Sequence, residues 1–254
     1  MEPVVQVEDL RKTYDLGSQQ VVGLAGVDLE ISSGEFVAVM GPSGSGKSTF
    51  MHIVGLLDEP TGGRYGFEGN DVSRLSEDER ADIRSRRLGF VFQSYNLLPR
   101  TTALENVELP MLYAGVPDTE RHRIALEKME LVGVAHLADH APNQMSGGQQ
   151  QRVAIARSLV NNPALILADE PTGALDTKTS QDVMQLFTRL NEEHGITILL
   201  VTHEPDVAAY AKRVVTFRDG KILSDVVSPR QARGGSIPHH DKEMPHDDTV
   251  EVVA

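Results

Sequence analysis

Two spacings of hydrophobic residues alternate along most of the chain. Short runs of consecutive apolar residues, rich in Val, Ile and Leu, are typical of strands that are buried on both faces. Segments with helical spacing lie between these runs; in 177–193, for example, Val183, Phe187 and Leu190 share one face. Strands that alternate with helices predict a parallel sheet covered by helices on both faces. The predicted buried strands cover residues 36–40, 88–92, 164–168 and 196–201.

The N-terminal part of the chain has a different pattern. Residues 4–10 and 21–31 alternate partly between apolar and polar positions, as strands of an antiparallel sheet with one solvated face do. Residues 12–17 are predicted to form a turn between these strands. A further short strand is predicted over 62–67, and a hairpin with an Asp-Gly turn over 213–223. The sequence therefore predicts an antiparallel β portion in addition to the parallel sheet.

The pattern becomes helical between the strands at 88–92 and 164–168. We expect a helical subdomain here, at about residues 94–160, inserted in a single domain that covers residues 1–227. Capping residues and apolar spacing predict its helices and one helix before it. These helices cover residues 76–86, 103–113, 119–132 and 146–160.

The last residues, 228–254, contain Pro, Gly, His and acidic residues without any hydrophobic period. Such a composition cannot build a core, so this segment is predicted to be a disordered tail. Its three histidines, His239, His240 and His246, offer metal ligands, but solvated histidines are the more common interpretation of such a tail.

Composition and charge mainly exclude classes of function. The 254-residue chain has a formal net charge of −13, which argues against a broad basic face for nucleic acid. It has no cysteine, so disulfides and thiolate metal sites are excluded. No apolar stretch approaches the roughly 18 residues that span a bilayer, and the N-terminus lacks the features of a signal peptide. If the protein works at a membrane, we expect another chain to cross it.

Residues 41–49, GPSGSGKST, carry the strongest chemical signal. They follow the strand at 36–40 and precede a helix that contains residues 50–54, which is the context in which G-x-x-x-x-G-K-[ST] binds phosphate. Backbone N–H groups of such a loop converge at the positive end of the helix. Lys47 adds a charge for the β- and γ-phosphates, and the Ser48 hydroxyl can bind Mg²⁺. The alternative, a Gly/Ser loop that matches by chance, is weakened by the flanking strand and helix. The predicted nucleotide-binding residues are Gly41, Pro42, Ser43, Gly44, Ser45, Gly46, Lys47, Ser48 and Thr49.

Two acidic residues end the apolar strand at 164–168. Asp169 and Glu170 should lie at the carboxyl edge of the sheet, beside the phosphate-binding loop. Asp169 can hold the Mg²⁺ shell, and Glu170 can activate water if it lies within hydrogen-bond range of it. An acidic cap after a buried strand is the alternative interpretation.

A second candidate anion site opens the helix at 146–160. Ser146, Gly147 and Gly148 would direct backbone N–H groups at an anion, although a plain serine cap with a glycine turn is the alternative. One nucleotide does not need two such sites in one subunit. We therefore expect this site to close over the nucleotide of a second copy of the chain.

Together these segments resemble the ATPase domain of ABC transporters. The resemblance covers about residues 4–223. Within the transporters, the sequences of several segments are similar to those of the macrolide-exporter and lipoprotein-release group. Met145 stands where the family usually has Leu, which is a nearly isosteric change. The matching segments, in family order, are GPSGSGKST, Gln93 after a strand, SGGQQQR, ILADEP, Gly173-Ala174-Leu175-Asp176 and His203 after an apolar strand.

The resemblance implies roles for individual residues. Tyr14 would stack on adenine, and Asp176 belongs to a loop that would meet the partner subunit. Gln93, Glu170 and His203 would be the catalytic residues, with His203 and Gln93 contacting the γ-phosphate side of the site. Ser48, Gln93 and Asp169 would hold Mg²⁺. The residues that would contact the nucleotide of the second subunit are Ser146, Gly147, Gly148 and Gln149.

The resemblance also implies a fold and a function. The expected fold is an α/β P-loop NTPase with a parallel-sheet core, an N-terminal antiparallel β subdomain and an inserted helical subdomain. Two copies would sandwich two ATP molecules with Mg²⁺ and hydrolyse them at the cytoplasmic face of the cell membrane. Closure of this homodimer would power a separate membrane permease, with a periplasmic or extracytoplasmic adaptor as a further partner and no nucleic acid. The alternative is an ATPase of a non-transport ABC complex, in cell-division signalling, DNA repair or translation.

The permease is expected to dock on residues 94–102, directly after Gln93. Leu97 and Leu98 would form a small exposed apolar surface there, flanked by Asn96 and Arg100. In the alternative, both leucines pack in the core of the helical subdomain.

Overall fold

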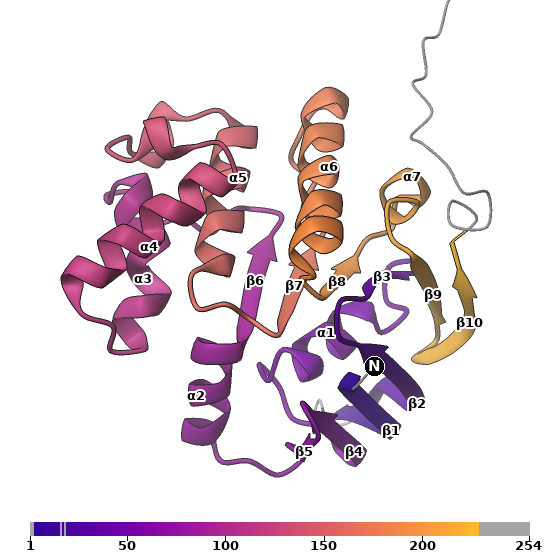
Figure 1. Ribbon diagram of the computed structural model, residues 1–254. Coiled ribbons are helices and arrows are strands. Elements are labelled where there is room, and N and C mark those ends of the chain that lie inside the picture. The colour runs from indigo at the N-terminus through magenta and orange to yellow at the C-terminus, as the bar shows by residue number, and fades with distance from the viewer. Residues whose placement is uncertain (1–2, 16, 18, 229–254) are drawn as a thin grey trace, which may run out of the picture.

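The structure is a computed structural model that describes residues 3–15, 17 and 19–228. These residues form two sheets and seven α-helices (Figure 1). The strands are β1 (Pro3–Asp15), β2 (Gln20–Ser32), β3 (Phe36–Met40), β4 (Gly62–Phe67), β5 (Asn70–Asp71), β6 (Leu88–Phe92), β7 (Leu165–Asp169), β8 (Ile198–Val201), β9 (Arg213–Arg218) and β10 (Lys221–Val227). The helices are α1 (Lys47–Val54), α2 (Glu77–Arg87), α3 (Ala103–Tyr113), α4 (Asp118–Leu131), α5 (Gly147–Leu159), α6 (Thr177–His194) and α7 (Pro205–Ala208), with the short 3-10 helices η1 (Ala135–Leu137) and η2 (Pro142–Gln144).

The larger sheet has the strand order β10-β9-β3-β8-β7-β6. The pairs from β9 to β6 are parallel, and β10 adds an antiparallel edge through a hairpin with β9. The smaller sheet, β2-β1-β4-β5, is antiparallel throughout. Because parallel strands share a carboxyl edge, the connections that follow β3, β6, β7 and β8 leave the large sheet on the same side.

The large sheet is buried on both faces by two hydrophobic clusters. In β7, Ile166 and Ala168 belong to the cluster that contains α3, α4, α5 and α6. Leu165 and Leu167 alternate with them and belong to the cluster formed with α1 and the antiparallel sheet. None of these four side chains is exposed, which explains why β7 reads as a continuous apolar run. The predicted α/β class with its additional antiparallel portion is confirmed.

The helices α3, α4 and α5 lie between β6 and β7 in the chain and at one side of the large sheet (Figure 1). Their starts follow from local capping. Thr102 caps α3 in a reciprocal pair with Glu105, and Ser76 caps α2 in the same way with Glu79. The predicted helices therefore exist within a residue or two of the expected bounds. The division into a domain over 1–227 with a subdomain at 94–160 stays a prediction.

Two details of the predicted organisation are wrong. Residues 12–15 do not form a turn, because β1 continues to Asp15 and pairs with β2 as far as Gln20. A register irregularity near Asp9, whose φ is 47°, interrupts the apolar alternation and hides the second half of the strand. Ser228 is not part of a loose tail, since it is buried and its N–H donates to the Lys212 carbonyl at 2.8 Å. The predictions for 229–254, including the three histidines, lie outside the described residues.

Candidate nucleotide-binding and catalytic site

The predicted phosphate-binding loop joins β3 to α1, and all nine of its predicted residues lie in this connection or in the first turn of α1. Gly41 and Gly46 have φ of 149° and 102°, and a Cβ at Gly46 would lie 2.5 Å from the Gly23 carbonyl oxygen. A Cβ at Gly41 would collide with the Phe217 carbonyl. Glycine is therefore required at both positions by conformation and by space. The loop brings the N-terminal turn of α1, with its unsatisfied N–H groups, to the carboxyl edge of the sheet.

Lys47 is buried in this loop and is folded back over it. Its Nζ donates to the carbonyls of Gly41 and Pro42, at 2.7 and 2.9 Å. Burial lowers the pKa of this ammonium group, while the nearby Glu170 and Asp169 act in the opposite direction. The Lys47 ammonium group thus lies against the backbone of the loop, close enough to Asp169 and Glu170 at the end of β7 for their charges to affect its pKa.

Asp169 and Glu170 concentrate negative charge beside Lys47. Burial, and then the charge of Glu170, raises the pKa of the Asp169 carboxyl. Two neighbouring carboxylates that are partly withdrawn from water create an unfavourable charge that a divalent cation would relieve. Together with the hydroxyl of Ser48 and the amide oxygen of Gln93, they provide hard oxygen donors of the type that Mg²⁺ prefers. The residues present therefore fit a magnesium ion.

Glu170 and His203 meet at the carboxyl ends of β7 and β8. Glu170 Oε1 lies 2.8 Å from His203 Nδ1, which is hydrogen-bond distance. Glu170 has a left-handed backbone, with φ of 43°, and its N–H donates to the Val201 carbonyl at 2.9 Å. A glutamate in this conformation needs support from its surroundings, and such strain is concentrated at functional sites. This contact brings together two of the three predicted catalytic residues.

Gln93 follows β6 and its side chain packs on Gly173, three residues after Glu170. A Cβ at Gly173 would lie 2.6 Å from Nε2 of Gln93, so any larger residue there would displace the amide. The Gly173 N–H in turn donates to the Glu170 carbonyl at 3.0 Å. Gln93 is therefore adjacent to the loop that carries Glu170, as the predicted role requires.

Tyr14 lies near the end of β1, close to the last residue of the phosphate-binding loop. A Cβ at Gly23 would touch both the Tyr14 ring and Thr49, at 3.0 Å each. The Tyr14 hydroxyl donates to Asp58 Oδ2 at 3.0 Å. Lys12 Nζ donates to Asp58 Oδ1 at 2.5 Å and lies 5.0 Å from the Tyr14 ring centroid. The ring is thus fixed beside the loop by partners that the sequence analysis did not identify.

The turn at Ser146 caps α5 with a reciprocal pair of hydrogen bonds. The Ser146 N–H donates to Gln149 Oε1 at 2.8 Å, and the Gln149 N–H donates to Ser146 Oγ at 3.3 Å. The side chains nearest to Gly147 and Gly148 belong to Tyr95, Leu175 and Thr179, none of which is in the phosphate-binding loop. Among the described residues, the nearest neighbours of this glycine turn therefore lie outside the phosphate-binding loop of its own chain.

Asp176, which was predicted to meet a partner subunit, has a local role in this structure. Its carboxylate accepts from the Thr179 N–H at 3.1 Å and from the Thr179 hydroxyl at 2.5 Å, and so caps α6. Hydrogen bonds from Thr179 hold the pKa of this carboxyl below its usual value.

Two polar residues of α5 also touch the site's loops and were missed from the sequence. Gln151 is fully buried, and its Nε2 donates at 2.7 Å to the carbonyl of Pro171, the residue after Glu170. Arg157 donates to the carbonyls of Tyr95 and Asn96 in the loop after Gln93. The sequence feature that could have indicated both residues is a polar side chain within an otherwise apolar helical run. Hydrophobic periodicity alone does not show what such a side chain contacts.

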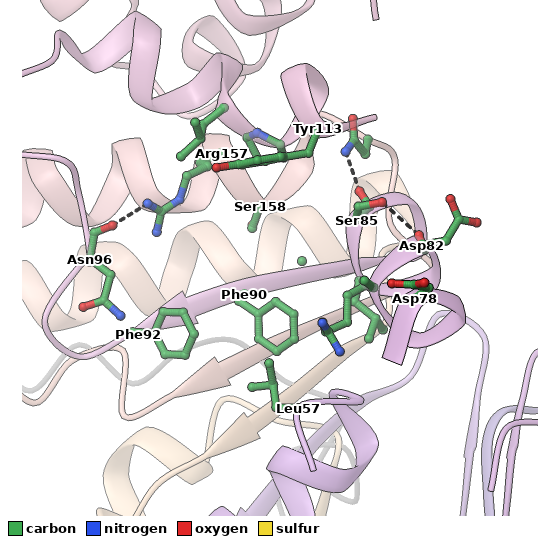
Figure 2. A pocket seen from close by; sticks show the side chains of 17 residues that line it. Leu57, Asp78, Asp82, Ser85, Phe90, Phe92, Asn96, Tyr113, Arg157 and Ser158 are labelled. Atoms are coloured by element: carbon green, nitrogen blue, oxygen red, sulfur yellow. Dashed lines mark hydrogen bonds between the residues drawn. The ribbon is translucent and has the colours of Figure 1, made fainter. Parts of the chain in front are cut away.

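A groove with a volume of about 730 Å³ opens next to this loop, between α2, α3 and β6. Figure 2 shows Phe90, Phe92 and Leu57 along one side of it and Tyr113 and Arg157 along the other. Tyr113, which lines this groove, is 76% exposed. The groove therefore presents an apolar surface within reach of the loop that follows Gln93.

The predicted docking leucines behave differently from each other. Leu97 packs against the hydrophobic core, which supports the alternative interpretation for this residue. Leu98 is 45% exposed, and its backbone is held by the buried Asn106, whose Oδ1 accepts from the Leu98 N–H at 2.7 Å. The prediction that both leucines are exposed is therefore wrong for Leu97. The groove described above offers a larger apolar surface than Leu98 alone.

Comparison with known proteins identifies the arrangement. A family model described as "ABC transporter" matches residues 24–173. An "Uncharacterized ABC transporter ATP-binding protein" of Thermotoga maritima is 55% identical over 222 residues, which are 87% of this chain and 94% of that protein. The "Macrolide export ATP-binding/permease protein MacB" of Syntrophobacter fumaroxidans is 51% identical over 244 residues. This match covers 95% of this chain, which spans only 33% of the length of that relative.

A solved structure agrees in fold. The dimeric, post-hydrolysis structure of the ATP-binding cassette MJ0796 bound to ADP and Pi has a TM-score of 0.80 and 47% sequence identity. The match covers 88% of this chain and 98% of that one. In the described part of this chain, every helix is too short or too polar to span a bilayer. With the family model matched over more than half of its length, the chain belongs to the ABC transporter family, as an ATP-binding cassette of the P-loop ATPase fold.

Proposed function

We propose that two copies of this chain bind Mg-ATP between them and hydrolyse it to drive a separate membrane permease of the macrolide-exporter or lipoprotein-release type. One observation carries the two-copy arrangement. The chain has two candidate anion sites, the phosphate-binding loop and the glycine turn at 146–148. The nearest neighbours of the glycine turn are Tyr95, Leu175 and Thr179, none of which belongs to the phosphate-binding loop. A second anion site that has no anion to bind in its own subunit is explained by a partner subunit.

In this proposal each residue has a defined task. The loop at 41–49 and Lys47 bind the phosphates, and Tyr14 stacks on the base. Glu170 accepts a proton from the attacking water, and the contact with His203 orients the carboxylate. Ser48, Asp169 and Gln93 would hold Mg²⁺, which when bound offsets phosphate charge. Gln93 packs on Gly173 and so links this position to the loop that carries Glu170.

Dimer closure follows from the same arrangement. ATP would contact one subunit's loop and the other's turn at 146–148, so it binds the closed dimer more tightly than the open one and shifts the population towards closure. Hydrolysis removes the shared ligand and lets the dimer reopen. The dimeric state of the similar cassette MJ0796 supports this arrangement.

The test is complementation between two inactive variants. Lys47→Ala disables the phosphate-binding loop, and Ser146→Arg blocks the opposite turn without touching that loop. A heterodimer of the two variants contains one doubly disabled site and one intact site. Random mixing should therefore restore about a quarter of wild-type ATPase activity, because half of the dimers carry one good site of two.

The result that overturns the composite site is equally clear. If each site were complete within one chain, mixing could not restore activity, and the mixture would stay as inactive as its components. Ser146→Arg alone is expected to bind ATP with near wild-type affinity while it fails to hydrolyse it. Equilibrium binding of a fluorescent ATP analogue measures the first property, and phosphate release measures the second.

The permease partner is proposed from the relatives and from the groove. The MacB relatives carry ATP-binding and permease functions in one protein, and this chain spans about a third of them. A permease in a separate chain would place this protein at the cytoplasmic face of the membrane, and an extracytoplasmic adaptor would complete the assembly. The groove lined by Phe90, Phe92 and Tyr113 offers an apolar surface for a permease helix. No observation here favours the alternative of a non-transport ABC complex.

A further inference from the structure

The last part of α5 contains one arginine within a buried run. Val153, Ala154, Ile155 and Ala156 precede Arg157, and each of these four is fully buried. The Arg157 guanidinium donates to two consecutive carbonyls, Tyr95 O at 2.9 Å and Asn96 O at 2.6 Å. Figure 2 shows the second of these bonds at the edge of the groove. In the described part of the chain no carboxylate forms an ion pair with Arg157, so its partners are backbone groups of this loop.

The backbone that Arg157 binds is strained. Tyr95 and Asn96 both have left-handed backbones, with φ of 60° and 50°. Asparagine tolerates this region, but a tyrosine there is a conformational outlier, and two such residues in succession are costlier still. The internal hydrogen bonds of the turn are few: the Tyr95 N–H donates to Phe92 O at 3.2 Å and the Asn96 N–H to Ser94 O at 2.6 Å. Conformations of this kind persist only when the surroundings enforce them.

The strained turn begins two residues after Gln93. The Gln93 amide packs against Gly173, and the chain on the C-terminal side of Gln93 is the turn itself. If the turn relaxed to ordinary right-handed or extended geometry, the direction of the chain after Gln93 would change. The position of Gln93 therefore depends on what holds residues 95 and 96.

We propose that Arg157 is a positioning residue that clamps the turn at Tyr95 and Asn96 and thereby holds Gln93 in the geometry that hydrolysis needs. The inference rests on the proposed function, because it assigns Arg157 to the same site. It also explains the residue type. The planar guanidinium presents parallel N–H groups to two carbonyls at once, whereas a lysine ammonium offers one compact charge.

The same helix carries a second link to this loop. A Cβ at Gly147 would lie 2.7 Å from the Tyr95 hydroxyl, so the Tyr95 side chain packs on the glycine turn that opens α5. Arg157 holds the backbone of residues 95 and 96 from the other end of that helix. Contacts at both ends of α5 therefore connect this helix to the loop that follows Gln93.

The experiment compares Arg157→Met and Arg157→Lys with the wild-type chain. Arg157→Met removes both hydrogen bonds and should lower kcat about tenfold, while KM for ATP stays within about twofold of wild type. A tenfold loss is what we expect if the free energy that these bonds supply is comparable to the cost of one strained backbone residue. Arg157→Lys should give an intermediate kcat. Amide hydrogen exchange supplies a readout that does not depend on turnover: the peptide over 93–98 should exchange several-fold faster in Arg157→Met than in wild type, while the peptide over 41–49 is unchanged.

Two further variants separate the clamp from a general loss of stability. Arg121 is the control, since its guanidinium in the helical insertion also donates to a backbone carbonyl, Val116 O at 2.9 Å, and in addition pairs with the exposed Asp118. Arg121→Met should leave kcat and exchange at 93–98 at wild-type values. In the Arg157→Met background, Asn96→Gly should raise kcat about threefold, because glycine adopts the left-handed region without the cost of a side chain.

Each outcome decides the proposal. A lower kcat with faster exchange at 93–98 and recovery by Asn96→Gly supports the clamp. A wild-type kcat in Arg157→Met overturns the clamp, provided that Gln93→Ala is inactive in the same assay. An equal loss of kcat in Arg121→Met also overturns it. So does a failure of Asn96→Gly to raise kcat in the Arg157→Met background. If the wild-type chain itself hydrolyses no ATP, the proposed function fails, and the exchange data then test the clamp alone.

Discussion

Replacing Glu170 by glutamine removes one negative charge and one proton acceptor with almost no change of shape. The glutamine carbonyl can keep the 2.8 Å contact to His203, and the left-handed backbone at this position is unaffected by the change. Burial and the charge of Glu170 together raise the pKa of Asp169, so the substitution removes the second of these causes and favours the ionised form of Asp169. Binding of Mg-ATP should therefore be retained.

The loss is confined to proton transfer from water. A positioned general base contributes roughly 10²–10⁴-fold to a rate, which is roughly 3–5 kcal/mol of activation free energy. Steady-state phosphate release by Glu170→Gln should fall by about a thousandfold within this range. Because hydrolysis is the step that reopens the dimer, gel filtration with Mg-ATP should show the variant at twice the monomer mass, while the wild-type chain stays mainly monomeric.

Glu192→Gln is a suitable control, since Glu192 is an exposed glutamate near the end of α6 and the substitution is chemically the same. It should behave as wild type in both assays. Turnover at the wild-type rate by Glu170→Gln would refute the assignment of Glu170 as the base. Loss of ATP binding by this variant would show instead that its carboxylate is needed to build the site.

Three other predictions concern Tyr14 as the platform for the base, the half-buried ion pair of Lys12 and Asp58, and the groove. Tyr14→Ala should weaken ATP binding by about ten- to a hundredfold, whereas Tyr14→Phe, which loses only the hydroxyl contact to Asp58, should bind within a few-fold of wild type; calorimetric titration distinguishes them. Burial acts to raise the pKa of Asp58, but hydrogen bonds, above all from Lys12, outweigh it and hold that pKa below its usual value, so the ionised carboxylate stabilises the fold at neutral pH. Asp58→Asn should therefore be less stable than wild type at pH 7, and the difference, followed by denaturant unfolding, should shrink as the pH falls below the ordinary aspartate pKa; a difference that is constant down to acid pH would contradict this. Tyr113→Asp should keep the ATPase rate and melting temperature of the isolated chain but lose stimulation by its permease in membranes, and unchanged stimulation would move the docking surface elsewhere.

Most of the large sheet and the phosphate site could be predicted because their signals are local. The strands at 36–40 and 88–92 are continuous apolar runs, and their bounds agree with β3 and β6. Lys47 and Ser48 follow from a loop motif whose geometry is set by its own glycines. Such features need no knowledge of distant residues.

The features that could not be predicted depend on contacts across the fold. The second half of β1 reads as a turn because a bulge near Asp9 breaks its alternation, and only pairing with β2 reveals the strand. Asp58 reaches Tyr14 over 44 positions and Arg157 reaches Tyr95 over 62 positions, so no short motif contains either pair. Leu97 and Leu98 are chemically alike, and only the packing of the helical insertion decides which of them is buried.

In the described part of the chain, the α-helices α2, α3 and α5 each begin with a reciprocal capping pair, and these pairs differ in one chemical detail. Helices α2 and α3 begin with a hydroxyl residue and a glutamate, Ser76 with Glu79 and Thr102 with Glu105, so each carries a carboxylate over its positive end. Helix α5 has the same hydrogen-bond geometry with Gln149 in place of glutamate. The amide satisfies the backbone as well as a carboxylate does, yet it leaves the positive potential of the helix uncancelled. The one helix start of the three that is expected to meet a phosphate is thus closed by a neutral residue, and a glutamate there would preserve the fold while repelling the ligand.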